Sequence, residues 1–332
     1  MLDSEITVIG GSGFIGTVLC KRLEVSGARF RIIDKVKSRL FTQQCIEMDI
    51  RNPKGISESV VRNSLIINLA AEHRDNVSPP SLYKDVNVTG AINVCNAARE
   101  NNVKTIVFTS SVAVYGFAPM GTSESGNIAP FNEYGRTKYE AEQVYKIWQA
   151  EFPDERSLVI VRPTVVFGEA NRGNVFNLLR QIASGRFIMI GDGQNRKSIA
   201  YVDNVAAFLE YALKFKPGVH IYNYVDKPDF NMNKLVSHIN QLLGKPSKIT
   251  LRLPYILGLI IGNLFDMVAK VINRNFLISA IRIKKFCANS VYESSVHESN
   301  FIPPVPLMEG IERTVRFEFI EDHSTEPLFF SE

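Results

Sequence analysis

The feature that most constrains the fold of this chain is a cluster of glycines directly after its first apolar run. Residues 6–10 lead into Gly10-Gly11-Ser12-Gly13-Phe14-Ile15-Gly16. Glycines at 10, 13 and 16 leave the backbone bare where a pyrophosphate would approach the N-terminus of the next helix, whose free N–H groups and dipole favour an anion. A glycine cluster between a strand and a helix therefore predicts a dinucleotide site.

Apolar runs alternate with amphipathic segments over the first two thirds of the chain. The runs are short, rich in Ile and Val and apolar on both faces, as parallel strands covered by helices on both sides must be. We expect strands at 6–10, 30–33, 45–48, 65–70, 105–110, 158–162 and 220–224, with helices that include 14–25, 81–100 and 133–151. This alternation predicts an α/β fold, a doubly wound parallel sheet of the Rossmann type.

The pattern loosens after about residue 167, where Gly, Asn and Pro become more frequent. We therefore expect a dinucleotide-binding domain at 1–167, to which 197–225 returns, and a smaller C-terminal substrate-binding domain at 168–332. A chain of 332 residues is long enough for two such intimate units.

Composition narrows the class of protein. The chain is 45% hydrophobic and 22% charged, and its net charge of +4 is spread along the sequence, which does not predict nucleic-acid binding. The four cysteines have neither pair nor metal spacing, so we expect free thiols and no metal site. With no signal-peptide pattern and no apolar stretch of bilayer length, a cytoplasmic location is expected.

An acidic residue follows the second expected strand. Asp34 lies eighteen residues after Gly16. A carboxylate there can accept both ribose hydroxyls of NAD and repels the 2′-phosphate of NADP. Lys35, Lys37 and Arg39 follow closely and weaken this preference, but the position still predicts NAD.

A tyrosine and a lysine begin the helix expected near residue 133. Tyr134 and Lys138 are four residues apart and therefore share one helical face. A phenol with a pKa of about 10 is a poor base at neutral pH, and a nearby ammonium stabilises its phenolate. Such a pair is common by chance. The order of glycine loop, acidic strand end, Ser110-Ser111 and Tyr/Lys helix makes this one a catalytic candidate.

In this order the motifs resemble, over nearly the whole chain, the extended short-chain dehydrogenases/reductases of the NAD-dependent epimerase/dehydratase family. The resemblance implies NAD as cofactor, Ser111 as the catalytic hydroxyl, Tyr134 as the base, and Lys138 as its activator and a ligand of the nicotinamide ribose. The cofactor contacts that it implies, with those of the glycine loop, are Gly10, Gly13, Phe14, Ile15, Gly16, Asp34, Asp49, Ile50, Leu69, Ala70, Ala71, Asn87, Ser110, Tyr134, Lys138, Pro163 and Val165.

The resemblance also implies a set of substrate contacts. They are His73, Arg74, Ser111, Thr164, Asn174, Val175, Arg196 and Arg282. For His73 and Arg74 a surface-loop role is an equal alternative. Arg282 has the alternative of facing a membrane surface or solvent.

The residues after Ser111 bear on the reaction. Val112 and Ala113 stand where sugar 4,6-dehydratases of this family carry an acid and a base, and neither can transfer a proton, so dehydration is not expected. An epimerase with a transient 4-keto sugar and a reductase with net hydride transfer both remain. The family resemblance favours the epimerase.

The chain resembles a bacterial subgroup of 4-epimerases in four segments, which are residues 70–79, 172–175, 222–228 and 282–287. The resemblance implies N-acetylglucosamine on undecaprenyl diphosphate as substrate, its N-acetylgalactosamine isomer as product, and a place in O-antigen synthesis. A UDP-linked sugar is the alternative. The family also implies a homodimer through the helices near 81–100 and 133–151.

Residues 254–274 combine a broad apolar surface with a narrow polar stripe. The stripe consists of Asn263, Asp266, Lys270 and Asn273, and the basic residues Arg274, Arg282, Lys284 and Lys285 follow. An apolar helix with a basic flank can lie in a membrane interface, which would make 254–285 a peripheral contact with the cytoplasmic face of the inner membrane. The same helix could instead close the core of the smaller domain.

Overall fold

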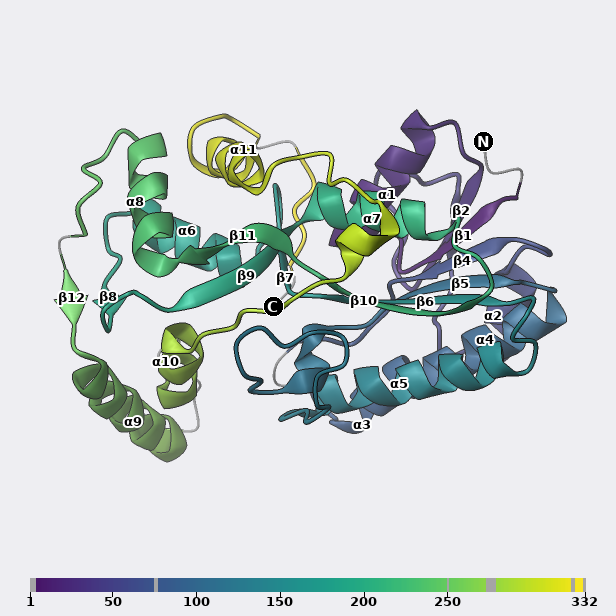
Figure 1. Cartoon of the computed structure of the whole chain (residues 1–332), viewed down its shortest axis with the longest axis horizontal. Coiled ribbons are helices and arrows are strands. Elements are labelled where there is room, and N and C mark those ends of the chain that lie inside the picture. Colours follow the sequence, from purple (N-terminus) through teal and green to yellow (C-terminus); the bar gives the residue numbers. More distant parts are fainter. Residues whose placement is uncertain (1–3, 75–76, 250, 273–278, 324–325, 331–332) are drawn as a thin grey trace.

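A seven-stranded parallel sheet forms the larger part of the molecule (Figure 1). This computed structural model describes residues 4–74, 77–249, 251–272, 279–323 and 326–330. The sheet contains β1 (Ile6–Ile9), β2 (Phe30–Asp34), β3 (Cys45–Glu47), β4 (Leu65–Asn68), β5 (Thr105–Thr109), β6 (Ser157–Pro163) and β10 (Gly218–Tyr224). Their order is β10-β6-β5-β4-β1-β2-β3, and every neighbouring pair is parallel. All seven strands expected from the sequence lie in this sheet, so the fold class is confirmed.

Helices cover both faces of the sheet, which is why its strands are apolar on both sides. On one face lie α1 (Phe14–Val25) and α7 (Val202–Ala212), with Leu19 and Phe208 fully buried beneath them. On the other lie α2 (Pro53–Ser59), α4 (Gly90–Glu100) and α5 (Glu133–Ala150), with Trp148 and Tyr145 buried between α5 and the sheet. The helix expected over 81–100 consists of α3 (Ser81–Lys84), a π-helical segment (Asp85–Thr89) and α4. Residues 112–115 form a 3₁₀ helix.

The smaller unit is built around a three-stranded sheet of β7 (Val165–Phe167), β9 (Arg196–Tyr201) and β11 (Asp226–Asn231). Helices α6 (Asn174–Ala183), α8 (Met232–Leu242) and α11 (Leu307–Phe319) belong to this unit and share its core. A short pair, β8 (Met189–Ile190) with β12 (Arg252–Leu253), lies at its edge. Because β9 belongs to this sheet, the chain returns to the large sheet through α7 and β10, from residue 202 rather than 197.

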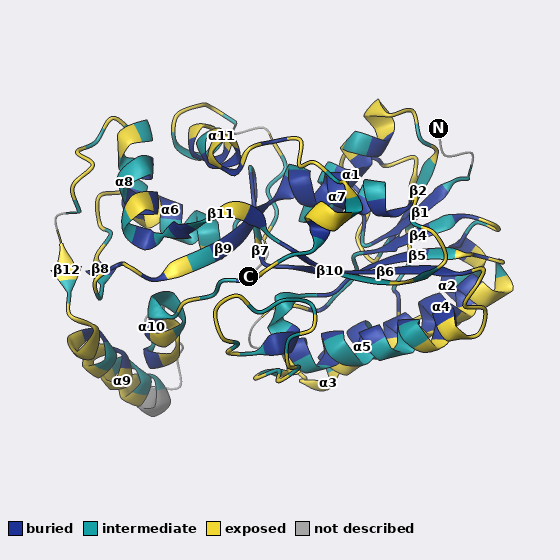
Figure 2. Cartoon of the chain, viewed as in Figure 1, coloured by how far each residue is buried: buried dark blue, intermediate teal, exposed yellow. Residues whose placement is uncertain are grey.

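Two helices project at the end of the smaller unit, away from the large sheet. They are α9 (Tyr255–Ile272) and α10 (Ala280–Cys287), which pack against each other (Figure 1). Figure 2 shows much of α9 as exposed. Among the described residues, no helix is both long and apolar enough to cross a membrane.

Candidate active site

A cleft of about 820 Å³ runs along the carboxyl ends of the central strands of the large sheet. This edge is where open α/β sheets bind their ligands. The predicted residues that line it are Gly10, Gly13, Phe14, Ile15, Gly16, Asp34, Asp49, Ile50, Leu69, Ala70, Ala71, His73, Arg74, Ser110, Ser111, Tyr134, Lys138, Pro163 and Thr164. The structure thus brings most of the expected site residues to one surface.

The glycine loop forms a cradle that a larger residue would fill. Gly10 has a φ of +81°, and a Cβ on it would lie 2.6 Å from the backbone nitrogen of Ala70 on the neighbouring strand end. A Cβ on Gly16 would lie 2.5 Å from Gly11 Cα. Gly13 caps α1 without a side-chain hydrogen bond, so the first N–H groups of the helix stay open to an anion. These residues fit the pyrophosphate of a dinucleotide.

Asp34 ends β2 and holds the glycine loop at the end of the cleft where the adenosine of NAD is expected to bind. Its carboxylate accepts hydrogen bonds from the backbone N–H groups of Ser12 and Val36, each at 3.0 Å. Burial raises the pKa of Asp34, and these N–H groups oppose that rise. Lys35 and Arg39 line the same end of the cleft. Asp49 is paired with Arg51 at 2.7 Å, which lowers the pKa of Asp49.

Ser111 and Tyr134 meet at the other end of the cleft. Asn132 caps α5 by accepting a hydrogen bond from Gly135 N at 2.9 Å, which places Tyr134 in the first turn of the helix. Ser111 follows the end of β5, and its hydroxyl lies close enough to the Tyr134 phenol to affect the pKa of that group. Burial raises the pKa of Tyr134, and the Ser111 hydroxyl lowers it. The serine therefore favours the phenolate that a base requires.

Lys138 lies one turn further along α5 and is 1% exposed. Its Nζ lies 4.3 Å from the centre of the Phe108 ring. Burial lowers the pKa of Lys138 to about 7, and the charge of Glu142 opposes this. Tyr134 and Lys138 both line the cleft, as their spacing predicts.

Glu142 belongs to a buried network that the sequence analysis missed. Its carboxylate accepts hydrogen bonds from Ser110 Oγ at 2.6 Å and from Arg162 Nε and Nη2 at 2.8 and 2.6 Å. Arg162 also donates to the Tyr115 hydroxyl at 2.7 Å. A glutamate one turn after Lys138 on the same helical face is the signal that could have revealed this network.

Some predicted contacts lie outside the lining of the cleft. Asn87 is buried and hydrogen-bonds Glu72 N and Thr137 Oγ1 at 2.8 and 2.9 Å, so it ties the loop after β4 to α5. The other residues outside the lining are Val165, Asn174, Val175, Arg196 and Arg282. Within it, Arg74 is held by Glu72 at 3.1 Å. The individual cofactor and substrate contacts stay predictions.

Residues 6–224 match the model of the NAD dependent epimerase/dehydratase family. The chain belongs to this family. Its cofactor is NAD, in agreement with the glycine cradle and Asp34.

Individual relatives agree with this membership. The chain is 45% identical, over the full length of both proteins, to the N-acetyl-alpha-D-glucosaminyl-diphospho-ditrans,octacis-undecaprenol 4-epimerase of Escherichia coli O157:H7. It is 26% identical to a UDP-glucose 4-epimerase of Vibrio cholerae, over 74% of this chain and 78% of that protein.

Solved structures share the fold. The UDP-N-acetylglucosamine 4-epimerase of Methanobrevibacter ruminantium M1 superposes with a TM-score of 0.75 at 20% identity, covering 96% of this chain and 98% of that one. The UDP-glucose 4-epimerase of Thermotoga maritima superposes with a TM-score of 0.74 at 20% identity, covering 94% and 98%.

The C-terminal segment forms part of the wall of this epimerase-family cleft. Residues 327–330 line the cleft. Two backbone hydrogen bonds fix Phe329: its N–H donates to Ala170 O at 2.9 Å, and its carbonyl accepts from Arg172 N at 2.7 Å. The rings of Phe14 and Phe329 lie 6.0 Å apart. No sequence pattern predicted this contribution.

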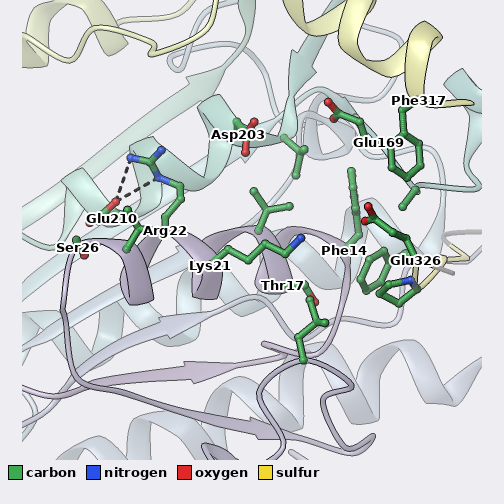
Figure 3. A pocket seen from close by; sticks show the side chains of 17 residues that line it. Phe14, Thr17, Lys21, Arg22, Ser26, Glu169, Asp203, Glu210, Phe317 and Glu326 are labelled. Atoms are coloured by element: carbon green, nitrogen blue, oxygen red, sulfur yellow. Dashed lines mark hydrogen bonds and ion pairs between the residues drawn. The ribbon is translucent and has the colours of Figure 1, made fainter. Parts of the chain in front are cut away.

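A second pocket, of about 540 Å³, shares Phe14 and Phe329 with the cleft (Figure 3). It is lined largely by α1 and α7, and an ion pair between Arg22 and Glu210 lies at one end. Ser111, Tyr134 and Lys138 lie outside its lining, so the chemistry belongs to the first cleft.

We expect Tyr134→Phe to lower the rate of sugar turnover by about 1,000-fold, because it removes the oxygen that exchanges the substrate proton. Turnover is measured with purified protein, and bound NAD is measured in parallel to show that the cleft is intact. Tyr139→Phe on the same helix, where Tyr139 packs in an apolar cluster, is the control and should stay near the wild-type rate. A Tyr134→Phe protein as fast as wild type would rule out the assigned base.

Asp34→Asn tests the origin of the NAD preference. The amide oxygen can still accept the Ser12 N–H, but the charge that repels a 2′-phosphate is gone. We expect the ratio of NADP to NAD affinity to rise by about 10-fold, measured by titrating NAD-free protein with each dinucleotide. Glu47→Gln on the neighbouring strand is the matched control. An unchanged ratio would mean that Asp34 does not select the cofactor.

Lys138→Met should stabilise the NAD-free protein while abolishing turnover. The folded pKa of about 7 lies below the unfolded value of 10.5, so folding releases a proton between these pH values. Stability therefore rises with pH across this window, and the full penalty is present at and below pH 7. Methionine removes the penalty, and we expect the free energy of unfolding at pH 7 to rise by about 4 kcal/mol.

Urea unfolding from pH 7 to 10 measures this change, and the slope of stability against pH should flatten in Lys138→Met. Lys146→Met, about two turns along α5, is the control and should keep the wild-type slope. A Lys138→Met protein less stable than wild type at pH 7 would show that the buried lysine is a net stabiliser.

Proposed function

We propose that this protein is a 4-epimerase that converts N-acetylglucosamine to N-acetylgalactosamine on undecaprenyl diphosphate, as a step in the synthesis of surface polysaccharide. The observation that carries the proposal is the 45% identity, over the full length of both chains, to the E. coli epimerase whose name specifies this lipid-linked sugar. The Ser111–Tyr134 pair at the end of the NAD cleft supplies the chemistry that such a reaction needs.

Tyr134 acts as the base. Its phenolate takes the proton of the sugar 4-hydroxyl, which leaves the C4–H bond free to lose hydride. The Ser111 hydroxyl donates a hydrogen bond to the same phenolic oxygen or to the 4-oxygen, and so holds the two oxygens within reach of each other. Lys138, one turn along the helix, supplies positive charge that favours the phenolate.

The glycine loop and Asp34 would hold NAD, which would supply a reversible hydride acceptor for C4. Between the two transfers the 4-keto sugar presents its opposite face, and Tyr134 gives the proton back to the 4-oxygen. Val112 and Ala113 contribute no acid or base beside the sugar, so no water is eliminated. The resulting change is an inversion at C4 with no net oxidation.

We assign the sugar and its diphosphate to the part of the cleft beyond Tyr134. His73, Arg74 and Thr164 line it there, and Arg74 is the cationic side chain among them. Asn174 and Val175 begin α6, and Arg196 begins β9, so all three belong to the smaller unit. We infer that they and Arg282 reach the diphosphate when substrate is bound. Homodimerisation through α4 and α5 likewise stays a prediction.

A UDP-linked sugar is the alternative substrate, and the similarity to the V. cholerae UDP-glucose 4-epimerase supports it. A reductase with net hydride transfer differs in its use of cofactor. An epimerase regenerates NAD in each cycle and needs no added dinucleotide, whereas a reductase must exchange it. The reductase would be excluded if the purified protein retained NAD through desalting and turned over the sugar without any added dinucleotide.

The substrate is tested by offering two diphosphate-linked sugars to purified protein without added NAD. One is N-acetylglucosamine diphosphate on an undecaprenyl carrier in detergent micelles, and the other is UDP-N-acetylglucosamine. We expect the galacto isomer from the lipid-linked sugar, at a rate at least 10-fold above that from the UDP-sugar, as contacts to the carrier raise kcat/KM. Conversion of the UDP-sugar alone would overturn the lipid-linked assignment. Tyr134→Phe is the blank in both arms.

A further inference from the structure

Helix α9 exposes bulky apolar side chains where a surface helix normally carries polar ones. Ile256 is 71% exposed, Met267 65%, Leu264 54% and Ile260 51%, and these four recur at helical spacing on one face. Among the side chains of α9 that the structure describes, the other exposed apolar ones are Tyr255, Leu257, Ile261 and Val268. A contiguous apolar surface of this kind marks a contact with a partner or a membrane.

The inward face of α9 is made of glycines. Gly258 and Gly262 are its buried residues among those described, and they let the helix approach its neighbours closely. A Cβ on Gly262 would lie 2.8 Å from Ala280 Cα of α10, and one on Gly258 would lie 2.8 Å from the Ile190 side chain of β8. The fully buried part of the packing surface of α9 therefore uses its glycines, with Leu259 and Phe265 partly buried, while eight bulky side chains are exposed.

This arrangement decides between the two interpretations of residues 254–274. The broad apolar surface of α9 does not close the core of the smaller unit, because its described side chains are largely exposed. The polar stripe expected from the sequence does not face solvent throughout. Its Asp266 accepts a hydrogen bond from Ala280 N, at the start of α10, at 3.0 Å. Asn263 is exposed. The side chains of Lys270, Asn273 and Arg274 lie outside the described part of the chain.

Basic side chains flank this surface, although the exposed Asp192 lies beside Arg252, whose guanidinium donates to the Asp192 carbonyl at 2.9 Å. Arg252 on β12 and Arg282 and Lys284 on α10 are exposed. Among the described residues of α9 and α10 the acidic side chain is Asp266, which bonds inward. Basic side chains beside an apolar helix are attracted to anionic lipid headgroups, each by about 1 kcal/mol. The surface therefore complements a negatively charged bilayer.

Next to α10, the loop before α5 adds further exposed apolar side chains. Lys285 of α10 lies with its Nζ 5.1 Å from the centre of the Phe131 ring, three residues before Tyr134. Phe131 stacks on Phe117 at 4.7 Å, and the two rings are 46% and 63% exposed. Met120, 60% exposed, belongs to the same loop. These exposed apolar residues thus lie beside α10, in the loop that leads into α5 and Tyr134.

We infer that α9, α10 and the Phe117–Phe131 pair form a docking surface for an anionic lipid bilayer. Helix α9 lies along the membrane interface with Ile256, Ile260, Leu264 and Met267 among the acyl chains, and the basic side chains contact the headgroups. The link to catalysis rests on the proposed function: docking presents the cleft to a sugar diphosphate whose lipid carrier remains in the bilayer.

A second copy of the chain fits this surface less well than a bilayer. A two-fold contact pairs one face with itself, so the basic side chains of one copy would meet those of the other. Anionic headgroups neutralise these charges instead.

Vesicle flotation tests the docking directly. The full-length protein is mixed with vesicles of 70% phosphatidylethanolamine and 30% phosphatidylglycerol, and separately with phosphatidylcholine vesicles. We expect wild type to float with the anionic vesicles and the triple variant Ile260→Glu/Leu264→Glu/Met267→Glu to bind at least 10-fold more weakly. Ile302→Glu, at a residue that is 83% exposed elsewhere, is the matched control and should float as wild type does.

Charge and folding are checked in the same experiment. Lys284→Gln or added salt should weaken flotation, because both reduce the attraction to the headgroups. Bound NAD should be unchanged in every variant, since the substitutions lie outside the cofactor cleft. Equal flotation of wild type and the triple variant would overturn the proposal. So would failure of wild type to bind anionic vesicles, or a wild-type dimer that the triple variant abolishes without any vesicle binding.

The experiments distinguish a failure of the proposed membrane docking from a failure of the proposed substrate. A protein that converts the lipid-linked sugar in detergent micelles but does not bind vesicles keeps the proposed function and loses the docking surface. A protein that binds vesicles through α9 but converts the UDP-sugar alone keeps the surface and loses the proposed substrate. If both hold, the triple variant should lose at least 10-fold in turnover of sugar embedded in vesicles and little in micelles.

Discussion

The catalytic site depends on a buried ion pair between Arg162 of β6 and Glu142 of α5. Both side chains are almost fully buried, and two hydrogen bonds join them. Removing one partner of such a pair costs about 3–5 kcal/mol, because the other charge is left without compensation. Ser110 completes the coordination of the carboxylate, so the pair fixes the end of β5 against the helix that carries Tyr134 and Lys138. The distance between Ser111 and Tyr134 is thus set by contacts deeper in the protein than the reacting atoms.

The large sheet, and the placing of Tyr134 and Lys138 on one helical face, could be predicted from the sequence because both follow from local pattern. Strands that are apolar on both faces occur in this fold only between helix layers, and a helix brings residues four apart onto one face. The Glu142–Arg162 pair and the wall formed by Phe329 were missed for a different reason. Each joins segments more than fifteen residues apart, and although Glu142 shares a helical face with Lys138, no local pattern identifies Arg162 or Phe329 as the partner. The short strands of the smaller sheet are likewise defined by their partners rather than by their own composition.

Helix α9 shows why an apolar pattern alone leaves two interpretations open. Hydrophobic periodicity identifies the broad face of the helix, but it does not say whether that face meets protein or lipid. The two glycines four residues apart carry the missing information once their neighbours are known: the glycine face packs, and the bulky face is left outside. A soluble core helix would show the opposite arrangement, since large side chains gain most from burial.

The two parts of the molecule place different constraints on the substrate. The large sheet holds the dinucleotide and the base, and these requirements are the same whatever carries the sugar. A nucleotide carrier needs an enclosed polar site for its base and ribose, whereas a polyprenyl carrier needs an open route from the cleft to the acyl chains. The exposed Phe117–Phe131 pair, which lies against Lys285 of α10 in the loop before α5, is compatible with the second requirement. Under the proposed docking, selection between carriers would fall to the outer helices of the smaller unit rather than to the residues that react.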